Sequence, residues 1–218
     1  MKLQGIKTVY FDYDGTLHNS IKTYAPAFRK GYDFLVQNNK APEKTFKDEE
    51  IQKWLGYTNY EMWENFMGDL DKHYKNQASK IIGEEMESLM YLGKGELYEN
   101  AIHVLKELKN RGYTLVFLSN CSNRYMETAC NVYNLNEYFD DMVCCQMHDY
   151  IPKHEILTKI KNKYPMNQVI VGDRFHDMES GIKNNINTIF CEYGFGNLDE
   201  GKNTTASIKN IKELLDIL

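Results

Sequence analysis

Residues 6–16 read IKTVYFDYDGT, and this stretch decides the fold because an apolar run leads directly into an acidic turn. The run 6–10 predicts a buried strand. Asp12 and Asp14 follow where that strand runs out, and side chains at positions i and i+2 of an extended segment lean the same way. Gly15 allows the chain to turn away beneath them, because a residue without a Cβ tolerates tight turns. Two carboxylates are therefore expected to face one small space.

Two neighbouring carboxylates repel each other unless a cation or a bound proton relieves the charge. A carboxylate can also act as a nucleophile and form an aspartyl-phosphate. The motif therefore suggests a metal-assisted phosphoryl-transfer site. Taken alone, the motif is more typical of an ordinary acidic turn after a strand, because such turns are common, so the rest of the chain has to decide.

The 218 residues are enough for one large domain, or for a core domain with a smaller one. The formal net charge of −5 argues against a nucleic-acid binder, which normally carries a basic patch. A small anionic substrate remains compatible with this charge, because a local lysine or metal can reverse the field inside a pocket.

No apolar run approaches the roughly 20 residues that a membrane helix needs. The first residues lead into a strand and lack the basic and apolar regions of a signal peptide. The five cysteines include no Cys-x-x-Cys pair, which favours reduced thiols in a cytoplasmic protein. The adjacent Cys144 and Cys145 could ligate a soft metal, but no second pair completes a four-ligand site.

From about residue 97 onward, short apolar runs alternate with amphipathic segments. This alternation predicts βαβ units and a parallel sheet covered on both faces, an α/β fold. After the first strand, the expected strands are 113–118, 142–145, 168–171 and 188–191, and the expected helices are 99–111, 124–133, 153–164, 178–184 and 207–218.

The segment 18–94 contains no convincing strand. Aromatic and aliphatic side chains recur there at helical intervals, as at Tyr24, Phe28 and Tyr32. We therefore expect a small helical bundle inserted after the first strand. The predicted domains are a core of residues 1–17 and 95–218, and the inserted bundle 18–94.

Ligand sites of open parallel sheets lie beyond the carboxyl ends of the strands. Polar residues follow several of the predicted strands or begin a predicted helix, and we expect them to meet at one edge of the sheet. These residues are Asp12, Asp14, Ser119, Asn120, Lys153, Asp173 and Asp177.

In this order, the segment 12–16, Ser119, Lys153 and the segment 172–177 resemble the four motifs of the haloacid dehalogenase superfamily. The helical insert resembles the superfamily's C1 cap, and the resemblance covers nearly the whole chain. It implies a Rossmann-like core with a helical cap, similar to phosphoglycolate phosphatases. Two departures stand out: Pro152 precedes the lysine instead of a proline following it, and Glu99-Asn100 replaces a usual Pro-Gly pair.

The resemblance implies a role for each catalytic residue. Asp12 is the expected nucleophile, and Asp14 is the expected acid that protonates the leaving oxygen and later activates water. Ser119 is expected to bind the transferring phosphoryl group, and Lys153 to neutralise charge on both the phosphate and Asp12. Substrate-binding residues implied in addition are Gly15, Thr16 and Asn120.

The implied cofactor is Mg²⁺, since oxygen ligands and phosphate suit it better than zinc. Its expected ligands are Asp12, Asp173 and the backbone carbonyl of Asp14. Asp177 is expected either to support the metal through water or to hold Lys153.

An acid at position 14 is kept in the superfamily's phosphatases and phosphomutases and is absent from its dehalogenases. The leading hypothesis is a Mg²⁺-dependent phosphatase that hydrolyses a small phosphate monoester through an aspartyl-phosphate. The alternatives are a sugar phosphomutase resembling beta-phosphoglucomutase and a non-catalytic protein that binds a phosphorylated metabolite. We expect a small phosphorylated metabolite as partner, no nucleic acid or membrane, and a monomer or weak dimer.

Several of these residues also have a purely structural interpretation. Ser119 could simply cap a helix, and His176 could be polar surface rather than a proton shuttle. Trp54 and Trp63 are expected to fill the core of the bundle. The turn 57–59 is the better candidate for contact with a substrate, because loops carry specificity.

Overall fold

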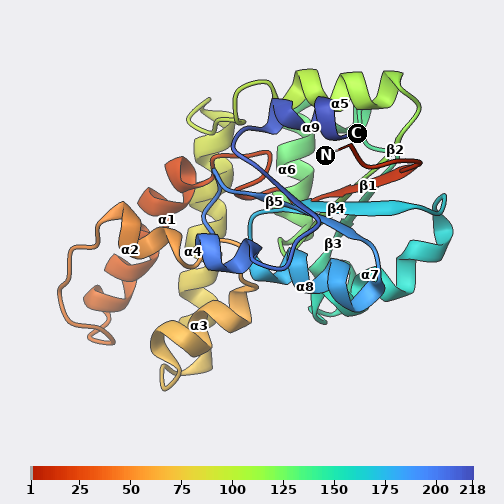
Figure 1. Ribbon diagram of the computed structural model, residues 1–218. Helices are drawn as coiled ribbons and strands as arrows, with labels where there is room; N and C mark the ends of the chain where they lie inside the picture. The colour runs from red at the N-terminus through yellow and green to blue at the C-terminus, as the bar shows by residue number, and fades with distance from the viewer. Residues whose placement is uncertain (1) are drawn as a thin grey trace. The chain divides into compact units, whose positions relative to one another are not determined.

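The computed structural model describes residues 2–218 and divides into two compact units. The sheet unit comprises Met1–Asn19 and Leu97–Leu218, and the helical unit is Ser20–Glu96. Both are labelled by element in Figure 1.

The sheet unit is built on six parallel strands in the order β3-β2-β1-β4-β5-β6. This confirms the predicted α/β fold with a parallel sheet. The strands are β1 Thr8–Phe11, β2 Thr114–Ser119, β3 Asp141–Cys144, β4 Gln168–Gly172, β5 Asn187–Cys191 and β6 Ala206–Ile208.

Strands β2 and β3 follow one another on one side of β1, and strands β4, β5 and β6 follow one another on its other side. The order of the strands therefore switches at β1, which lies between β2 and β4. Phe11 at the end of β1 pairs with Phe117 on one side and with Val171 on the other. The carboxyl ends of these three strands therefore lie level with one another. Open α/β sheets bind ligands at such a switch point.

Helices cover the sheet from both sides, with α5 and α9 on one side and α7 and α8 on the other (Figure 1). The helices of this unit are α5 Ala101–Asn110, α6 Asn123–Tyr133, α7 Lys153–Ile160, α8 Phe175–Asn184 and α9 Leu214–Ile217. Short 3₁₀ segments connect them at Leu135–Glu137, Cys145–His148, Lys161–Lys163, Leu198–Gly201 and Ile211–Glu213.

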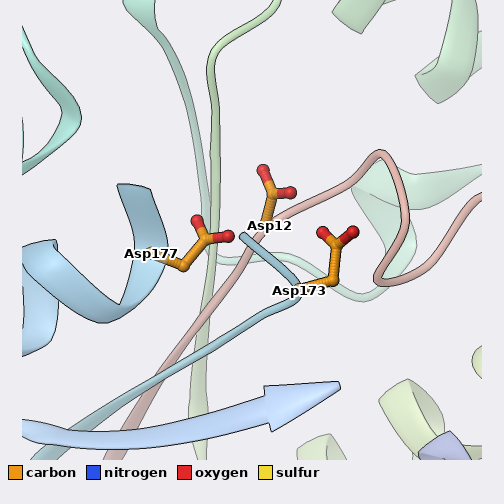
Figure 2. A group of neighbouring side chains, drawn as sticks. All are labelled: Asp12, Asp173 and Asp177. Atoms are coloured by element: carbon orange, nitrogen blue, oxygen red, sulfur yellow. The ribbon is translucent and has the colours of Figure 1, made fainter. Parts of the chain in front are cut away.

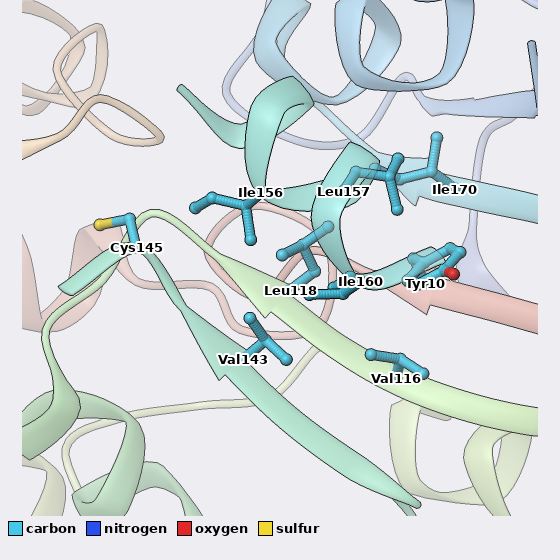
Figure 3. Packing of buried hydrophobic residues seen from close by; sticks show 9 residues of the cluster. All are labelled: Tyr10, Val116, Leu118, Val143, Cys145, Ile156, Leu157, Ile160 and Ile170. Atoms are coloured by element: carbon cyan, nitrogen blue, oxygen red, sulfur yellow. The ribbon is translucent and has the colours of Figure 1, made fainter. Parts of the chain in front are cut away.

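A buried hydrophobic cluster joins α7 to the strands beneath it (Figure 3). Ile156, Leu157 and Ile160 come from α7, where the i, i+1 and i+4 spacing places them on one face. They pack on strand residues that include Val116 and Leu118, which are two positions apart and share a face of the sheet. This packing fixes the first residue of α7, Lys153, relative to the strand ends.

The predicted helix 207–218 is wrong in its first part. Ala206–Ile208 forms the edge strand β6 instead, and only the short 3₁₀ segment and α9 follow. Ile208 pairs with Cys191, and its carbonyl accepts a hydrogen bond from the backbone N–H of Glu192. The edge of β5 offers this pairing, so tertiary contacts override the local helical pattern.

The helical unit contains α1 Ile21–Gln37, α2 Asp48–Gln52, α3 Asn59–Met67 and α4 Lys72–Tyr91. Helices α1 and α4 pack closely at Gly31, where a Cβ would lie 2.6 Å from Cγ1 of Ile82. Phe28, Phe46 and Phe66 form an aromatic core. Among residues 2–218, no helix combines the length and the apolar character needed to cross a bilayer.

Both tryptophans belong to this packing. Trp63 is 3% exposed and donates its indole N–H to Oγ of Ser79 at 2.6 Å. Trp54 lies edge-on to Phe66 with ring centroids 5.7 Å apart.

Candidate active site

Asp12 is the first residue after β1, and its side chain is buried. Its backbone N–H donates to the carbonyl of Val171 at 3.0 Å, which continues the pairing of β1 with β4 by one residue. Beyond it the chain turns tightly, because the carbonyl of Tyr13 accepts hydrogen bonds from the N–H groups of Leu17 and His18. Gly15 adopts a φ of 85° in this turn, a conformation that favours glycine.

Lys153 connects two of the acidic residues. Its Nζ donates to Oδ1 of Asp12 at 2.8 Å and to Oδ1 of Asp177 at 2.7 Å. All three side chains are buried. Burial alone lowers the pKa of Lys153, but the two carboxylates outweigh it and raise that pKa above its usual value. The lysine is therefore held in its charged form between two acids.

Asp177 lies in the first turn of α8 and has two functions there. Its Oδ2 accepts the backbone N–H of Arg174 at 3.1 Å, which is one of the backbone donors at the helix N-terminus. Its Oδ1 holds Lys153. Gly172 makes this approach possible, since a Cβ at that position would lie 2.2 Å from Cγ of Asp177.

Asp173 follows β4 and is fully buried. Its Oδ2 accepts the backbone N–H of Phe195 at 2.6 Å. Two glycines lie against its side chain. A Cβ added at Gly15 would lie 2.1 Å from Oδ2 of Asp173, and a Cβ added at Gly194 would lie 2.2 Å from the Cβ of Asp173. The sequence reasoning missed the loop 193–196 that follows β5, although its two glycines after a strand were the available signal.

Asp12, Asp173 and Asp177 bring their carboxylates together, with one oxygen from each within 4.8 Å of the others. Figure 2 shows the three groups directed into one space. Burial, followed by the charge of Asp177, raises the pKa of Asp12 to about 7. Burial and the charges of Asp12 and Asp177 raise the pKa of Asp173 well above its usual value. The cluster therefore needs positive charge beyond that of Lys153 to be fully ionised at neutral pH.

A divalent cation fits this cluster chemically. Oδ1 of Asp173 is buried and has no hydrogen-bond partner among the described residues, and such an atom is costly to bury unless something binds it. The available donors are carboxylate oxygens, which suit Mg²⁺. The residues that could hold the metal are Asp12 and Asp173, with Asp177 next to them.

Asp14 has partners of its own. Its side chain does not belong to the carboxylate group just described. Instead, its Oδ1 accepts the hydroxyl of Tyr125 at 2.9 Å, and Nδ1 of His18 lies 3.7 Å from the same oxygen. Asp12 and Asp14 thus leave the same strand end but have different partners. The sequence reasoning did not identify His18 or Tyr125.

The remaining predicted residues lie at the same edge of the sheet. Ser119 ends β2 two residues beyond Phe117, and both Ser119 and Asn120 are buried. Ser122, not Ser119, caps α6, because its Oγ accepts the backbone N–H of Tyr125 at 3.3 Å. The structural interpretation of Ser119 as the cap of that helix is therefore wrong.

Thr16 is buried, and its carbonyl accepts the hydroxyl of Tyr193 at 2.8 Å. His176 is also buried, with its ring 3.8 Å from that of Phe175, so it is not the surface residue considered above. In the turn 57–59, Thr58 caps α3 and Asn59 accepts a hydrogen bond from Ser79.

The family model for the haloacid dehalogenase-like hydrolases matches residues 9–191, which include every acidic residue of this site. The chain belongs to this family. It is therefore a hydrolase, and the predicted superfamily resemblance is confirmed. The matched region includes the insert as well as most of the sheet.

The chain is similar to a phosphoglycolate phosphatase of Psychrobacter arcticus, with 25% identity over 95% of this chain and 94% of that protein. It is also similar to the pyrophosphatase PpaX of Bacillus cereus, with 24% identity over 81% of this chain and 78% of the relative. Among solved structures, a predicted phosphatase from Clostridium acetobutylicum has the same fold, with a TM-score of 0.82, 21% identity and coverage of 97% of both chains.

Proposed function

We propose that this haloacid dehalogenase-like hydrolase is a Mg²⁺-dependent phosphatase that hydrolyses a small phosphate monoester through an aspartyl-phosphate. The observation that carries the proposal is the contact of the buried Asp12 carboxylate with Lys153 at 2.8 Å, beside two further carboxylates at the switch point of the sheet. The relatives named for phosphoglycolate phosphatase and pyrophosphatase activity support a phosphorylated substrate.

In the first step, a carboxylate oxygen of Asp12 attacks phosphorus, and the bond from phosphorus to the leaving oxygen breaks. Asp14 transfers its proton to that oxygen, so the product leaves as a neutral alcohol. Lys153 keeps its charge throughout and offsets the charge of the phosphoryl group next to Asp12. Ser119 and the N–H groups after it bind the phosphoryl oxygens.

In the second step, water attacks the aspartyl-phosphate and Asp14 accepts its proton. The bond between phosphorus and Asp12 breaks, which releases inorganic phosphate and restores the carboxylate. Asp173 and Asp12 are the residues that would hold the cofactor, together with the backbone carbonyl of Asp14. When bound, Mg²⁺ supplies positive charge that keeps the carboxylates ionised and offsets the charge on phosphate.

The helical unit is proposed as the cap that admits and selects substrates, since loops and lids of this kind exclude water and add specificity contacts. Its predicted limits, residues 18–94, differ by two residues at each end from the compact unit Ser20–Glu96. The substrate itself stays at the level of a small phosphorylated metabolite, because a fold hosts many substrates.

Release of inorganic phosphate from p-nitrophenyl phosphate, with and without Mg²⁺, tests the proposal. The wild type is expected to turn over only with metal, and Asp12→Asn is expected to be inactive although folded by circular dichroism. Asp199→Asn is the matched control, because Asp199 is 77% exposed and outside the site. Equal turnover by wild type and Asp12→Asn would reject the aspartyl-phosphate. When a sugar phosphate is the substrate, an isomerised product without phosphate release would indicate the mutase alternative instead.

A further inference from the structure

The carboxylate of Asp14 ends a chain of buried polar side chains. Its Oδ1 accepts the hydroxyl of Tyr125 at 2.9 Å, and Nδ1 of His18 lies 3.2 Å from the same hydroxyl. On the other side of the imidazole ring, Nε2 lies 3.4 Å from the hydroxyl of Tyr133. These contacts join residues that are more than 100 positions apart in the sequence.

The chain of contacts has one consistent direction when Asp14 is ionised. A carboxylate can only accept, so the single hydroxyl proton of Tyr125 is directed to Asp14. The oxygen of Tyr125 is then free to accept from Nδ1–H of His18, and Nε2 accepts from Tyr133. Each group has one proton to give, and every proton points toward Asp14.

The local structure holds this chain in place. His18 is fully buried and stacks on Tyr13, with ring centroids 5.0 Å apart and planes 11° from parallel. Its backbone lies beside Asp14 and Leu97. The backbone of Tyr125 is bound by the helix cap Ser122. Burial, then the charge of Asp14, raises the pKa of Tyr125 well above its usual value, so the hydroxyl remains a donor.

Asp14 presents two oxygens, and only Oδ1 carries these contacts. No hydrogen bond to its Oδ2 occurs within residues 2–218, and 15% of the side chain is exposed. Binding of one carboxylate oxygen by a buried donor restricts the rotation of the group and leaves the other oxygen for a reacting partner.

We propose that Tyr125 and His18 are positioning residues that hold Asp14 by one oxygen, so that the other faces the leaving group as general acid. This inference rests on the proposed phosphatase function. Tyr125 acts directly on the carboxylate, and His18 acts by orienting the Tyr125 hydroxyl.

The test compares Tyr125→Phe with wild type on two substrates that differ in their need for a proton. The leaving group of an alkyl phosphate is a basic alkoxide, whereas the leaving group of p-nitrophenyl phosphate is a stabilised phenolate. The ratio kcat/KM reports the steps up to leaving-group departure. We expect kcat/KM to fall on the order of 10-fold or more for the alkyl phosphate and less than about 3-fold for the aryl phosphate.

Tyr113→Phe is the matched control. The hydroxyl of Tyr113 donates to the carbonyl of Leu218 at 2.6 Å, next to the start of β2 and away from the strand ends that carry the site. This variant loses a comparable tyrosine hydrogen bond, and both substrates should be hydrolysed at the wild-type rate. An equal loss on both substrates in Tyr125→Phe, or no loss, would overturn the positioning role.

A second pair of variants tests His18 and serves if Tyr125→Phe fails to fold. His18→Asn keeps an N–H donor near the position of Nδ1, whereas His18→Leu removes it. The asparagine variant should retain most of the alkyl phosphate activity, and the leucine variant should lose it selectively. Identical behaviour of the two would overturn the role of His18. Loss of all activity in Asp12→Asn, measured alongside, separates a failure of this inference from a failure of the proposed function.

Discussion

Nζ of Lys153 lies 2.7 Å from Oδ1 of Asp177, and the two residues belong to the first turns of neighbouring helices. Asp177 is itself bound to the N-terminus of α8 through Arg174. The lysine is thus anchored to a helix end on one side and reaches Asp12 on the other. Asp177 is positioned to support the lysine whether or not it also approaches a metal.

Removal of this lysine should destabilise the protein strongly. Lys153→Met leaves the buried carboxylates of Asp12 and Asp177 without their cation, and breaking a buried pair in this way costs about 3–5 kcal/mol. Urea unfolding in the presence of EDTA measures the loss. It should be larger at about pH 8 than at about pH 5, because protons neutralise the orphaned acids at the lower pH.

Lys109→Met is the control for this experiment. Lys109 pairs with Asp140 at 2.9 Å, but both side chains are more than a third exposed. Such a pair contributes less than about 1 kcal/mol. If Lys153→Met proved no more harmful than Lys109→Met, the buried bridge would not stabilise the fold.

Without metal, stability should fall as pH rises from about 4 to about 7. Folding raises the pKa of Asp12 to about 7 and that of Asp173 further above its usual value, mainly through burial. In this window the native state holds protons that the unfolded chain has released. The free energy of unfolding therefore decreases by up to about 1.4 kcal/mol per pH unit for each such proton.

Mg²⁺ should flatten this dependence, because a bound cation replaces the protons on the carboxylates. Urea unfolding across the same pH range, with EDTA or with Mg²⁺, checks both statements. Asp173→Asn should weaken the slope and remove the effect of metal, whereas the exposed Asp199→Asn should change neither. A stability that rises with pH in EDTA would contradict the raised pKa values.

The grouping of Asp12 and Asp173 was predictable because the ends of adjacent parallel strands meet at one edge of a sheet. The contacts that hold the acidic side chains of the site in place were not predictable. Phe195 binds Asp173 only because the loop after β5 returns to the end of β4, and that contact spans 22 residues. Tyr125 reaches Asp14 across 111 residues. Neither contact leaves a periodic signal in the sequence.

The end of the chain shows a limit of a different kind. The expected helix begins at residue 207, and the spacing of Ile208 and Ile211 is compatible with a helix. Both side chains are buried, but Ile208 is buried as the last residue of a three-residue strand. So short a strand has no room for the alternation that identifies longer ones.

The helical unit is expected to set substrate preference. Tyr57 follows Gly56, whose φ is 85°, and its ring packs edge-on against Trp54. Tyr57→Ala should change the ratio of kcat/KM values among phosphorylated metabolites while leaving p-nitrophenyl phosphate hydrolysis nearly intact. Tyr91→Ala, a change at an exposed position of the same unit, is the control. Equal losses on all substrates, aryl phosphates included, would count against this role.

Gly194→Ala should weaken metal binding without a backbone penalty. A Cβ at this position would lie 2.2 Å from the Cβ of Asp173, so the carboxylate has to move. Gly194 does not adopt the left-handed conformation in which alanine is strained. Changes to the groups that orient a metal ligand typically lower metal affinity by about 10–100-fold. We therefore expect calorimetry to show an Mg²⁺ affinity about 10–100-fold below that of the wild type.

Gly83→Ala provides the comparison, because a Cβ added there would meet nothing within 4 Å apart from the neighbouring backbone of its own helix. Within α4 this change should stabilise the fold by about 0.5–1 kcal/mol and leave metal affinity unchanged. Urea unfolding in EDTA separates the two effects, since it reports the fold without the metal. If Gly194→Ala unfolded like the wild type and still bound Mg²⁺ with wild-type affinity, Asp173 would not be a ligand, and the metal would have to be held elsewhere on the chain.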